Sequence, residues 1–284
     1  MKKIAVVGGA SSLAKYLIPV LSKKNEVISL GRKDCDVYCD LQKDLETIII
    51  PENTDVVVHI AAGFKGKTDE DIIQTEEINA LGTLKICMAA KKTNVKHLIL
   101  ISSQYVKLEE DFLYYGIYSL SKRHSEELAT YYCKQNNLPL TILRPSQLYD
   151  AKDEYRKSQP LIYLMTDKAQ KGENIEIYGN NDALRNYIYV EDLAEIISRT
   201  IDLGIEGIYS CNFPKDYKLS KIAKVAQSAF NNGGEIVFLK DKQNIPDNVF
   251  DNKTDLYEKI NFYPHIDIEI GMKKIAEYRK GGKQ

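Results

Sequence analysis

The sequence predicts an α/β protein: a doubly wound parallel sheet with a smaller C-terminal α/β lobe. Three observations support this prediction. Short apolar runs alternate with amphipathic stretches in the first half, the runs are rich in β-branched residues, and the chain becomes more polar after Arg144-Pro145. Apolar runs without polar alternation are typical of strands that helices cover on both faces, and strand–helix–strand order is typical of a parallel sheet.

Five short runs are expected to be the strands of this sheet: Ile4–Val7, Val27–Leu30, Val56–Ile60, Leu98–Ile101 and Leu140–Leu143. Three stretches between them have helical spacing: Leu13–Lys23, Ile72–Lys91 and Tyr118–Asn136. We expect residues 1–145 to form the first domain and residues 146–284 mainly the second lobe. Two later runs, Tyr187–Val190 and Gly207–Cys211, are expected to be strands near 187–211 that return to the main sheet.

The composition argues against several function classes. The 284 residues carry 39 Lys+Arg and 40 Asp+Glu, a formal net charge of −1, so no broad nucleic-acid surface is expected. Five scattered cysteines favour reduced thiols and no metal centre. The apolar run Ile4–Val7 is shorter than the roughly 7–15 residues of a signal-peptide core, and no run reaches the roughly 18 residues of a membrane span. We therefore expect a cytoplasmic protein that binds no membrane.

A glycine-containing turn, Gly8-Gly9-Ala10-Ser11-Ser12-Leu13-Ala14, lies between the first strand and the first helix. A dinucleotide fold needs a glycine there for the tight turn, a small residue that lets the pyrophosphate approach, and another for helix–strand packing. Gly8, Ser11 and Ala14 occupy these places, and the helix N-terminus offers N–H groups to phosphates. The pattern is degenerate, and a tight turn without a ligand is the alternative.

The end of the second strand carries cations. Asp or Glu is usual there in NAD sites, where it binds the ribose 2′-hydroxyl. This chain has Leu30-Gly31-Arg32-Lys33 instead. Arg32 and Lys33 suit the 2′-phosphate of NADP, and a solvated basic turn is the alternative.

A phenol and an ammonium, Tyr118 and Lys122, stand four residues apart on one helix face. A free tyrosine has a pKa of about 10, and a neighbouring cation favours the phenolate and so lowers the pKa. Ser103 follows the fourth expected strand, at the edge where a parallel sheet places its ligand crevice. These three residues are therefore candidates for acid–base chemistry.

Together these residues make the sequence similar to the extended short-chain dehydrogenase/reductase family, which contains NAD(P)-dependent nucleotide-sugar epimerases, dehydratases and reductases. The similarity runs from the first strand to the last helix. Its further segments are Asp40-Leu41, Asp55-Val56-Val57-Val58-His59-Ile60-Ala61-Ala62, Glu77-Ile78-Asn79-Ala80-Leu81-Gly82-Thr83, Leu143-Arg144-Pro145-Ser146-Gln147-Leu148-Tyr149, Ile177-Tyr178-Gly179 and Arg185-Asn186-Tyr187-Ile188-Tyr189-Val190-Glu191-Asp192. The resemblance implies a Rossmann dinucleotide-binding domain, a substrate-binding lobe and a homodimer.

The resemblance also implies roles for single residues. Tyr118 would exchange a proton with the substrate oxygen, Lys122 would hold the nicotinamide ribose and lower the pKa of the phenol, and Ser103 would hydrogen-bond the same oxygen. Predicted cofactor contacts are Gly8, Ser11, Ser12, Leu13, Arg32, Asp40, Leu41, Ala61, Ala62, Tyr118, Lys122 and Pro145. Predicted substrate contacts are Ser103, Gln104 and Arg185, the last on a diphosphate. His59 and Asn79 are expected to be structural.

Three reactions share this residue set. Dehydratases of the family carry an acidic pair after the catalytic Ser or Thr, where this chain has Gln104-Tyr105, so dehydration is not expected. The leading hypothesis is an NADPH-dependent reductase of a 4-keto nucleotide sugar, such as a 4-keto-6-deoxyhexose, because Arg32 and Lys33 favour NADP(H). An epimerase that uses NAD(H) on a nucleotide-diphosphate sugar is the alternative. A non-catalytic NADP-binding sensor is a third hypothesis.

Overall fold

The computed structural model describes residues 1–251 and 253–282. The chain divides into two compact units, and each is described by itself. The first unit comprises Met1–Pro145, Ala194–Ser210 and Thr254–Asn261, and the second comprises Ser146–Leu193, Cys211–Lys253 and Phe262–Gln284.

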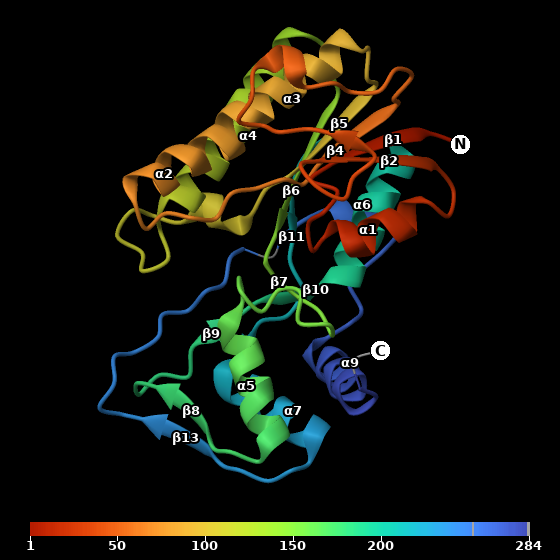
Figure 1. Ribbon diagram of the computed structural model, residues 1–284. Coiled ribbons are helices and arrows are strands. Elements are labelled where there is room, and N and C mark those ends of the chain that lie inside the picture. The colour runs from red at the N-terminus through yellow and green to blue at the C-terminus, as the bar shows by residue number, and fades with distance from the viewer. Residues whose placement is uncertain (252, 283–284) are drawn as a thin grey trace. The chain divides into compact units, whose positions relative to one another are not determined.

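A seven-stranded sheet with the order β11-β6-β5-β4-β1-β2-β3 forms the centre of the first unit (Figure 1). Its strands are β1 (Lys3–Val7), β2 (Glu26–Gly31), β3 (Val37–Tyr38), β4 (Val56–His59), β5 (His97–Ile101), β6 (Leu140–Pro145) and β11 (Gly207–Cys211). The pairs from β3 across to β6 are parallel. The predicted doubly wound fold class is confirmed.

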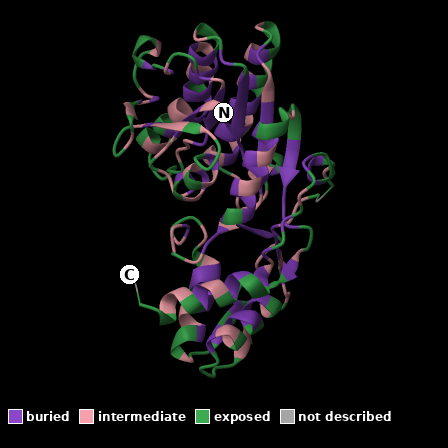
Figure 2. Ribbon diagram, turned by 90° about the vertical axis from the view of Figure 1, so that its right-hand side faces the viewer, coloured by how far each residue is buried: buried purple, intermediate pink, exposed green. Residues whose placement is uncertain are grey.

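Helices cover both faces of this sheet. They are α1 (Ala14–Leu21), α2 (Asp69–Glu76), α3 (Gly82–Lys92), α4 (Ile117–Gln135), α6 (Val190–Leu203) and α8 (Leu256–Lys259), with short turns η1 (Leu45–Thr47) and η3 (Gln104–Lys107). In Figure 1, α3 and α4 lie on one face, and α1 and α6 lie on the other. Figure 2 shows buried strands between them, and β1, β4 and β5 are buried at nearly every position, which explains their mainly apolar runs.

The long helix expected over Ile72–Lys91 is wrong in detail. A π turn, η2 (Glu77–Leu81), separates α2 from α3. Buried Asn79 lies in this turn, and its side-chain amide forms hydrogen bonds with the backbone of Gly63 and with the hydroxyl of Ser121. Such π turns are frequent at functional sites because they place a side chain out of helical register. Apolar periodicity does not predict this extra residue in the turn.

Three small sheets and three helices form the second unit. The sheet pairs are β10 (Tyr187–Tyr189) with β7 (Gln147–Tyr149), β12 (Tyr217–Lys218) with β9 (Leu184–Arg185), and β13 (Ile236–Leu239) with β8 (Ile175–Tyr178). The helices are α5 (Pro160–Lys171), α7 (Leu219–Phe230) and α9 (Ile268–Lys280).

The expected return of Tyr187–Val190 to the main sheet is wrong. Residues Tyr187–Tyr189 pair in parallel with β7, with Tyr187 opposite Gln147. Edge-to-face contacts between buried rings support this pairing, because the Tyr149 ring lies 5.9 Å from Tyr187 and 5.1 Å from Tyr189. In contrast, β11 lies beside β6 in the main sheet.

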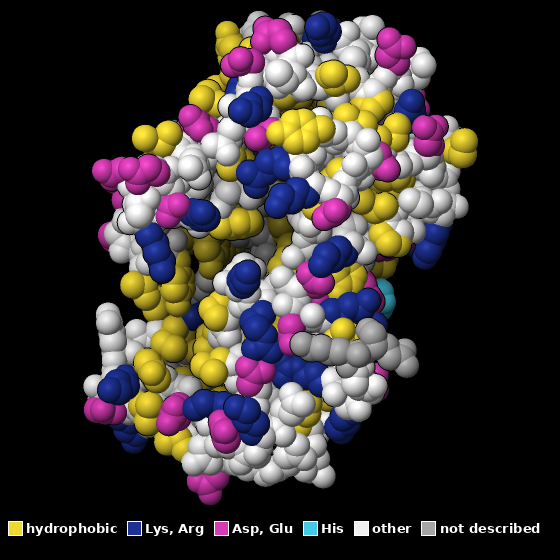
Figure 3. All heavy atoms as spheres, viewed as in Figure 1, with side chains coloured by type: hydrophobic (Ala, Val, Ile, Leu, Met, Phe, Trp, Pro, Cys, Tyr) yellow, Lys and Arg dark blue, Asp and Glu magenta, His cyan; other side chains and the backbone are white. Residues whose placement is uncertain are grey.

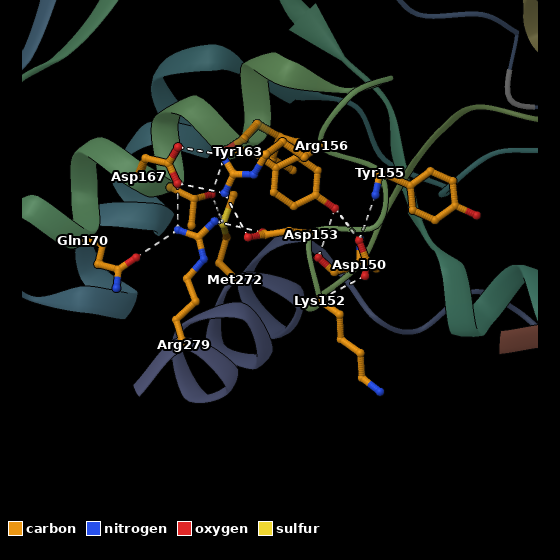
Figure 4. Close-up of polar contacts among 12 residues, drawn as sticks. Asp150, Lys152, Asp153, Tyr155, Arg156, Tyr163, Asp167, Gln170, Met272 and Arg279 are labelled. Atoms are coloured by element: carbon orange, nitrogen blue, oxygen red, sulfur yellow. Dashed lines mark hydrogen bonds and ion pairs between the residues drawn. The ribbon is translucent and has the colours of Figure 1, made fainter. Parts of the chain in front are cut away.

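An ion-pair cluster fastens the last helix within the second unit (Figure 4). Arg279 of α9 contacts Asp153 at 2.9 Å and Asp167 of α5 at 3.0 Å. Arg156 contacts the same two carboxylates, at 2.9 Å and 2.6 Å. Two cations therefore match two anions, and the cluster joins α5, α9 and the loop after β7.

Figure 3 shows cationic and anionic side chains interspersed on the face in view. Across the described residues, no helix is long and apolar enough to cross a membrane. Within the same ranges, no group of three or more His, Cys, Asp or Glu side chains could hold a metal ion. All five cysteines are free thiols.

Candidate active site

The strand register gathers the predicted site residues of the first unit at one edge of the sheet. Val7 pairs with Leu30 and His59, and Ile101 pairs with Leu143, so these parallel strands end together. The residues that follow them are the glycine turn, the basic turn, Ala61-Ala62 and Ser103. Ligands bind at this edge of an open parallel sheet.

The glycine turn approaches β4 too closely for a side chain at Gly8. Gly8 has φ +98°, and a Cβ there would lie 2.7 Å from the Ala61 nitrogen. The Gly8 and Gly9 nitrogens both donate to the Leu30 carbonyl, at 2.8 and 3.0 Å. The turn is therefore fastened to two strand ends, and α1 begins after it at Ala14. A residue without a side chain is therefore required where the turn passes Ala61.

A pocket of about 560 Å³ lies against this turn. It is lined by Val7, Gly8, Ala10, Ser11, Gly31, Arg32, Lys33, Cys39, Asp40, Leu41, Ala61, Ala62 and Ile78. Seven residues predicted to bind a cofactor are thus brought together: Gly8, Ser11, Arg32, Asp40, Leu41, Ala61 and Ala62. The remaining predicted cofactor contacts, Ser12, Leu13, Pro145, Tyr118 and Lys122, lie outside this lining.

The pocket presents two cations where β2 ends. Arg32 and Lys33 are exposed and line it. The Asp36 carboxylate is directed instead at Ser29, accepting from its nitrogen at 2.8 Å and its hydroxyl at 2.7 Å. These hydrogen bonds lower the pKa of Asp36. The positive charge at the end of β2 is suited to an anionic group on a bound nucleotide.

Tyr118 and Lys122 lie on the first turns of α4, and Ser103 lies just after β5. The Ser103 side chain lies near enough to the Tyr118 phenol to lower its pKa. Lys122 is 2% exposed, and its Nζ donates to the Ile101 carbonyl at 2.7 Å. The structure therefore brings the three predicted catalytic residues to the end of β5.

Burial dominates the acid–base properties of this group. It raises the pKa of Tyr118 to about 12, opposed by the hydrogen bond from Ser103 and reinforced by Tyr105. Burial also lowers the pKa of Lys122 to about 8, opposed by Glu126. Desolvation of the phenolate therefore outweighs the lowering by Ser103, and the expected lowering of the Tyr118 pKa by Lys122 stays a prediction.

Two predicted substrate residues are committed to other contacts. Gln104 is fully buried, and its Nε2 donates to the Arg144 carbonyl at 3.0 Å. Arg185, in the second unit, is 2% exposed, and its Nη1 donates to the carbonyls of Leu184 at 2.7 Å and Pro246 at 2.8 Å. The substrate roles of Gln104 and Arg185 stay predictions, and these contacts give them no support.

His59 is a buried histidine within β4. Its Nε2 lies 3.0 Å from the Thr83 hydroxyl, and burial lowers its pKa to about 3. The ring is therefore neutral at pH 7, which agrees with the structural role expected for it.

Sequence reasoning missed two aromatic rings around Tyr118. The Phe64 ring stacks on the Tyr118 ring with a centroid distance of 4.9 Å and an interplanar angle of 22°. The Tyr105 ring lies edge-on at 6.3 Å. The available signal was an aromatic residue between two glycines, Gly63 and Gly66, directly after Ala61-Ala62.

Comparisons with known proteins agree with this geometry. The model of the family described as "NAD dependent epimerase/dehydratase family" matches residues 4–210. A curated relative, the putative UDP-glucose 4-epimerase of Methanocaldococcus jannaschii, is 24% identical over 307 residues, covering 99% of each chain.

Similar solved structures share the fold. The UDP-N-acetylglucosamine 4-epimerase of Methanobrevibacter ruminantium, in complex with UDP-N-acetylmuramic acid, has a TM-score of 0.81 at 19% identity over 99% of this chain and 98% of that one. RMD of Pseudomonas aeruginosa, complexed with NADPH, has a TM-score of 0.79 at 19% identity over 98% of both chains.

Proposed function

The chain belongs to the NAD dependent epimerase/dehydratase family, and on that premise we propose that it is a nucleotide-sugar epimerase. It is an NAD(P)-dependent enzyme of the extended short-chain dehydrogenase/reductase type. The observation that supports epimerisation best is the near-complete alignment with 4-epimerases in sequence and fold. This reaction replaces the reductase as the leading hypothesis.

The residues of the first unit fit a dinucleotide. The tight turn at Gly8, which is bonded to Leu30 and packed against Ala61, and the adjacent pocket suit a diphosphate and its adenosine. Gly8 and Ser11 would hold the diphosphate, and Asp40 with Leu41 would lie on the adenine side. A bound nicotinamide would supply the means to take up a hydride from a sugar carbon and to give it back. Proton exchange at the substrate oxygen falls to the chain itself.

The proposed proton exchange is assigned to Tyr118. As a phenolate it would remove the proton of the sugar hydroxyl during oxidation, and as the resulting phenol it would return that proton during reduction. Ser103 donates a hydrogen bond to the same oxygen and stabilises the charge that develops there. Lys122 has two ammonium N–H groups besides the one directed at Ile101, and these would bind the ribose hydroxyls of the nucleotide.

The NADPH-dependent reductase of a 4-keto nucleotide sugar is the second candidate. A specific observation favours it: Arg32 and Lys33 line the pocket, whereas the Asp36 carboxylate is directed at Ser29. Two cations without a ribose-binding acid suit a 2′-phosphate. In this reaction Tyr118 only donates a proton.

The nucleotide retained by freshly purified protein separates the two candidates. The protein is denatured, and the released nucleotide is quantified per subunit by chromatography. Near-stoichiometric NAD, together with interconversion of UDP-glucose and UDP-galactose, supports the epimerase. An empty site that prefers NADPH, together with NADPH oxidation by a 4-keto nucleotide sugar, supports the reductase.

Tyr118→Phe tests the chemistry that both candidates share. Removing the hydroxyl is expected to lower kcat by at least about 100-fold, as for loss of a general acid–base group, while dinucleotide affinity changes less than about 2-fold. Steady-state turnover and a dinucleotide titration measure the two effects. Full activity of this variant would refute the assignment, and turnover that depends on Tyr118 also separates an enzyme from a sensor. The expected homodimer stays a prediction, which the molar mass measured by light scattering would test.

A further inference from the structure

Phe64 is an exposed aromatic residue in contact with the proposed proton-exchanging tyrosine. Its ring covers the Tyr118 ring at a centroid distance of 4.9 Å, yet 64% of the Phe64 side chain remains exposed. Stacking on Tyr118 therefore buries only a small part of the Phe64 ring and leaves most of it in contact with water. The remaining apolar surface is available to whatever molecule approaches the Tyr118 hydroxyl.

The loop holds Phe64 from both sides. The Asn79 side chain accepts from the Gly63 nitrogen at 2.7 Å and donates to the Gly63 carbonyl at 3.0 Å. On the other side, the Thr75 hydroxyl donates to the Lys65 carbonyl at 2.6 Å. Fixing the backbone on both sides of Phe64 orients its ring before a ligand arrives, which lowers the entropy lost on binding.

The loop also lies against the start of α4. A Cβ at Gly66 would lie 2.6 Å from the Ile117 Cγ2, so the chain passes Ile117 where only glycine fits. Ile117 directly precedes Tyr118. The same loop is therefore fastened at the π turn through Asn79 and packed beside the tyrosine, which gives the two rings a defined relative position.

The chemistry of this position favours neutral, C–H-bearing groups. An aromatic face carries partial negative charge, so it attracts C–H groups and cations and repels carboxylates. The nearest loop cation is matched by an anion, because Lys65 Nζ lies 3.9 Å from Asp71 Oδ1. A sugar carboxylate beside Phe64 would lose water and would have to compete with Asp71 for the neighbouring lysine, Lys65.

We propose that Phe64 is a specificity-determining residue: its ring forms an apolar wall of the sugar subsite and selects nucleotide sugars with a neutral C5 substituent over those with a C5 carboxylate. The inference rests on the proposed function and deepens it. It separates this chain from relatives whose names contain a uronic acid, such as the UDP-glucuronic acid 4-epimerase of Bacillus cereus and the UDP-glucuronic acid decarboxylase 1 of Xenopus tropicalis.

The test measures binding by calorimetry, in a Tyr118→Phe background saturated with NAD. This background prevents turnover and keeps the ring that Phe64 covers. The affinities of UDP-glucose, dTDP-glucose and GDP-mannose for this protein are first measured and compared with those of UDP, dTDP and GDP. The nucleotide whose affinity increases most when the sugar is attached is then used for Phe64→Leu and for the matched control Tyr131→Leu. The control removes a tyrosine that is 67% exposed on α4, the helix that also carries Tyr118.

Phe64→Leu is expected to weaken the hexose nucleotide by about 3- to 10-fold, the range of one aromatic contact, and to leave the nucleoside diphosphate unchanged. The preference for the hexose over its C6-carboxylate counterpart should fall by a similar factor, and Tyr131→Leu should change neither ratio. A wild-type-like preference in Phe64→Leu would overturn the inference alone. If no nucleotide sugar binds better than its diphosphate before Phe64 is changed, the proposed function is overturned as well.

Discussion

Lys122→Met is expected to stabilise the protein while it removes a residue of the proposed site. The Lys122 ammonium is 2% exposed, and burial lowers its pKa from 10.5 to about 8. At about 1.4 kcal/mol for each tenfold change, this lowering corresponds to about 3 kcal/mol that folding spends to keep the charge. Loss of the hydrogen bond to the Ile101 carbonyl lowers the free energy of unfolding by about 1–2 kcal/mol. The free energy of unfolding at pH 7 should therefore rise by about 1–2 kcal/mol.

The pH dependence of this difference has a defined sign. Below pH 8 the lysine is charged in both the folded and the unfolded state, so the cost of burying the charge is complete. Between pH 8 and pH 10.5 the unfolded chain binds a proton that the folded chain does not, so the wild-type protein gains stability as the pH rises. Its gain between pH 7 and pH 9.5 is about 2 kcal/mol, and the advantage of Lys122→Met should disappear over that interval.

Urea unfolding followed by circular dichroism at pH 7 and pH 9.5 measures this effect. The matched control is Lys134→Met, which removes an exposed lysine from the same helix and should change stability by less than about 0.5 kcal/mol at either pH. A less stable Lys122→Met protein at pH 7, or a difference from wild type that does not change with pH, would refute the reasoning. Either result would mean that the ammonium is solvated or fully paired in the folded chain.

Two further predictions concern the nucleotide site. Arg32→Ala should weaken NADPH binding by at least about 10-fold more than NADH binding, because a charge-assisted phosphate contact contributes roughly 1.5–3 kcal/mol; equal losses in fluorescence titrations would remove the basis for NADP preference. Gly8→Ala should cost at least about 3 kcal/mol of unfolding free energy, since it combines a left-handed φ with a 2.7 Å clash. Gly204→Ala, with φ +61° and open space, should cost only about 1–2 kcal/mol, and similar values for the two would contradict the close approach at Gly8.

The parts of the fold that follow from periodicity could be predicted. Each expected strand of the first half overlaps a strand of the sheet, because helices cover both faces and most positions of each run are apolar. The pairing of Tyr187–Tyr189 could not be predicted in the same way. A run of three buried residues could pair with a strand of either unit, and pairing with β7 depends on the tyrosine rings that pack around it.

The same distinction applies to the site. Gly8, Arg32 and Ala61 were predictable because parallel strands end at one edge, so residues just beyond those ends converge. The π turn at Asn79 and the ring of Phe64 were not predictable, since both depend on contacts made by a loop without periodicity. The pKa of Tyr118 is a further case: a nearby lysine in the sequence suggests a lowered value, whereas burial, which only the packed structure gives, raises it to about 12.

The raised pKa of Tyr118 links proton chemistry to the choice between the two reactions. A phenol with a pKa of about 12 is protonated at pH 7, so it can donate a proton to a ketone without further change. Taking a proton from a sugar alcohol requires the phenolate, which burial of Tyr118 disfavours. An epimerase must therefore gain positive charge beside Tyr118 before its first step, as an oxidised nicotinamide would supply. Phe64→Ala uncovers one face of Tyr118, so the pKa of the phenol should fall without any added cation. Titration of labelled tyrosine by NMR would detect this lower pKa.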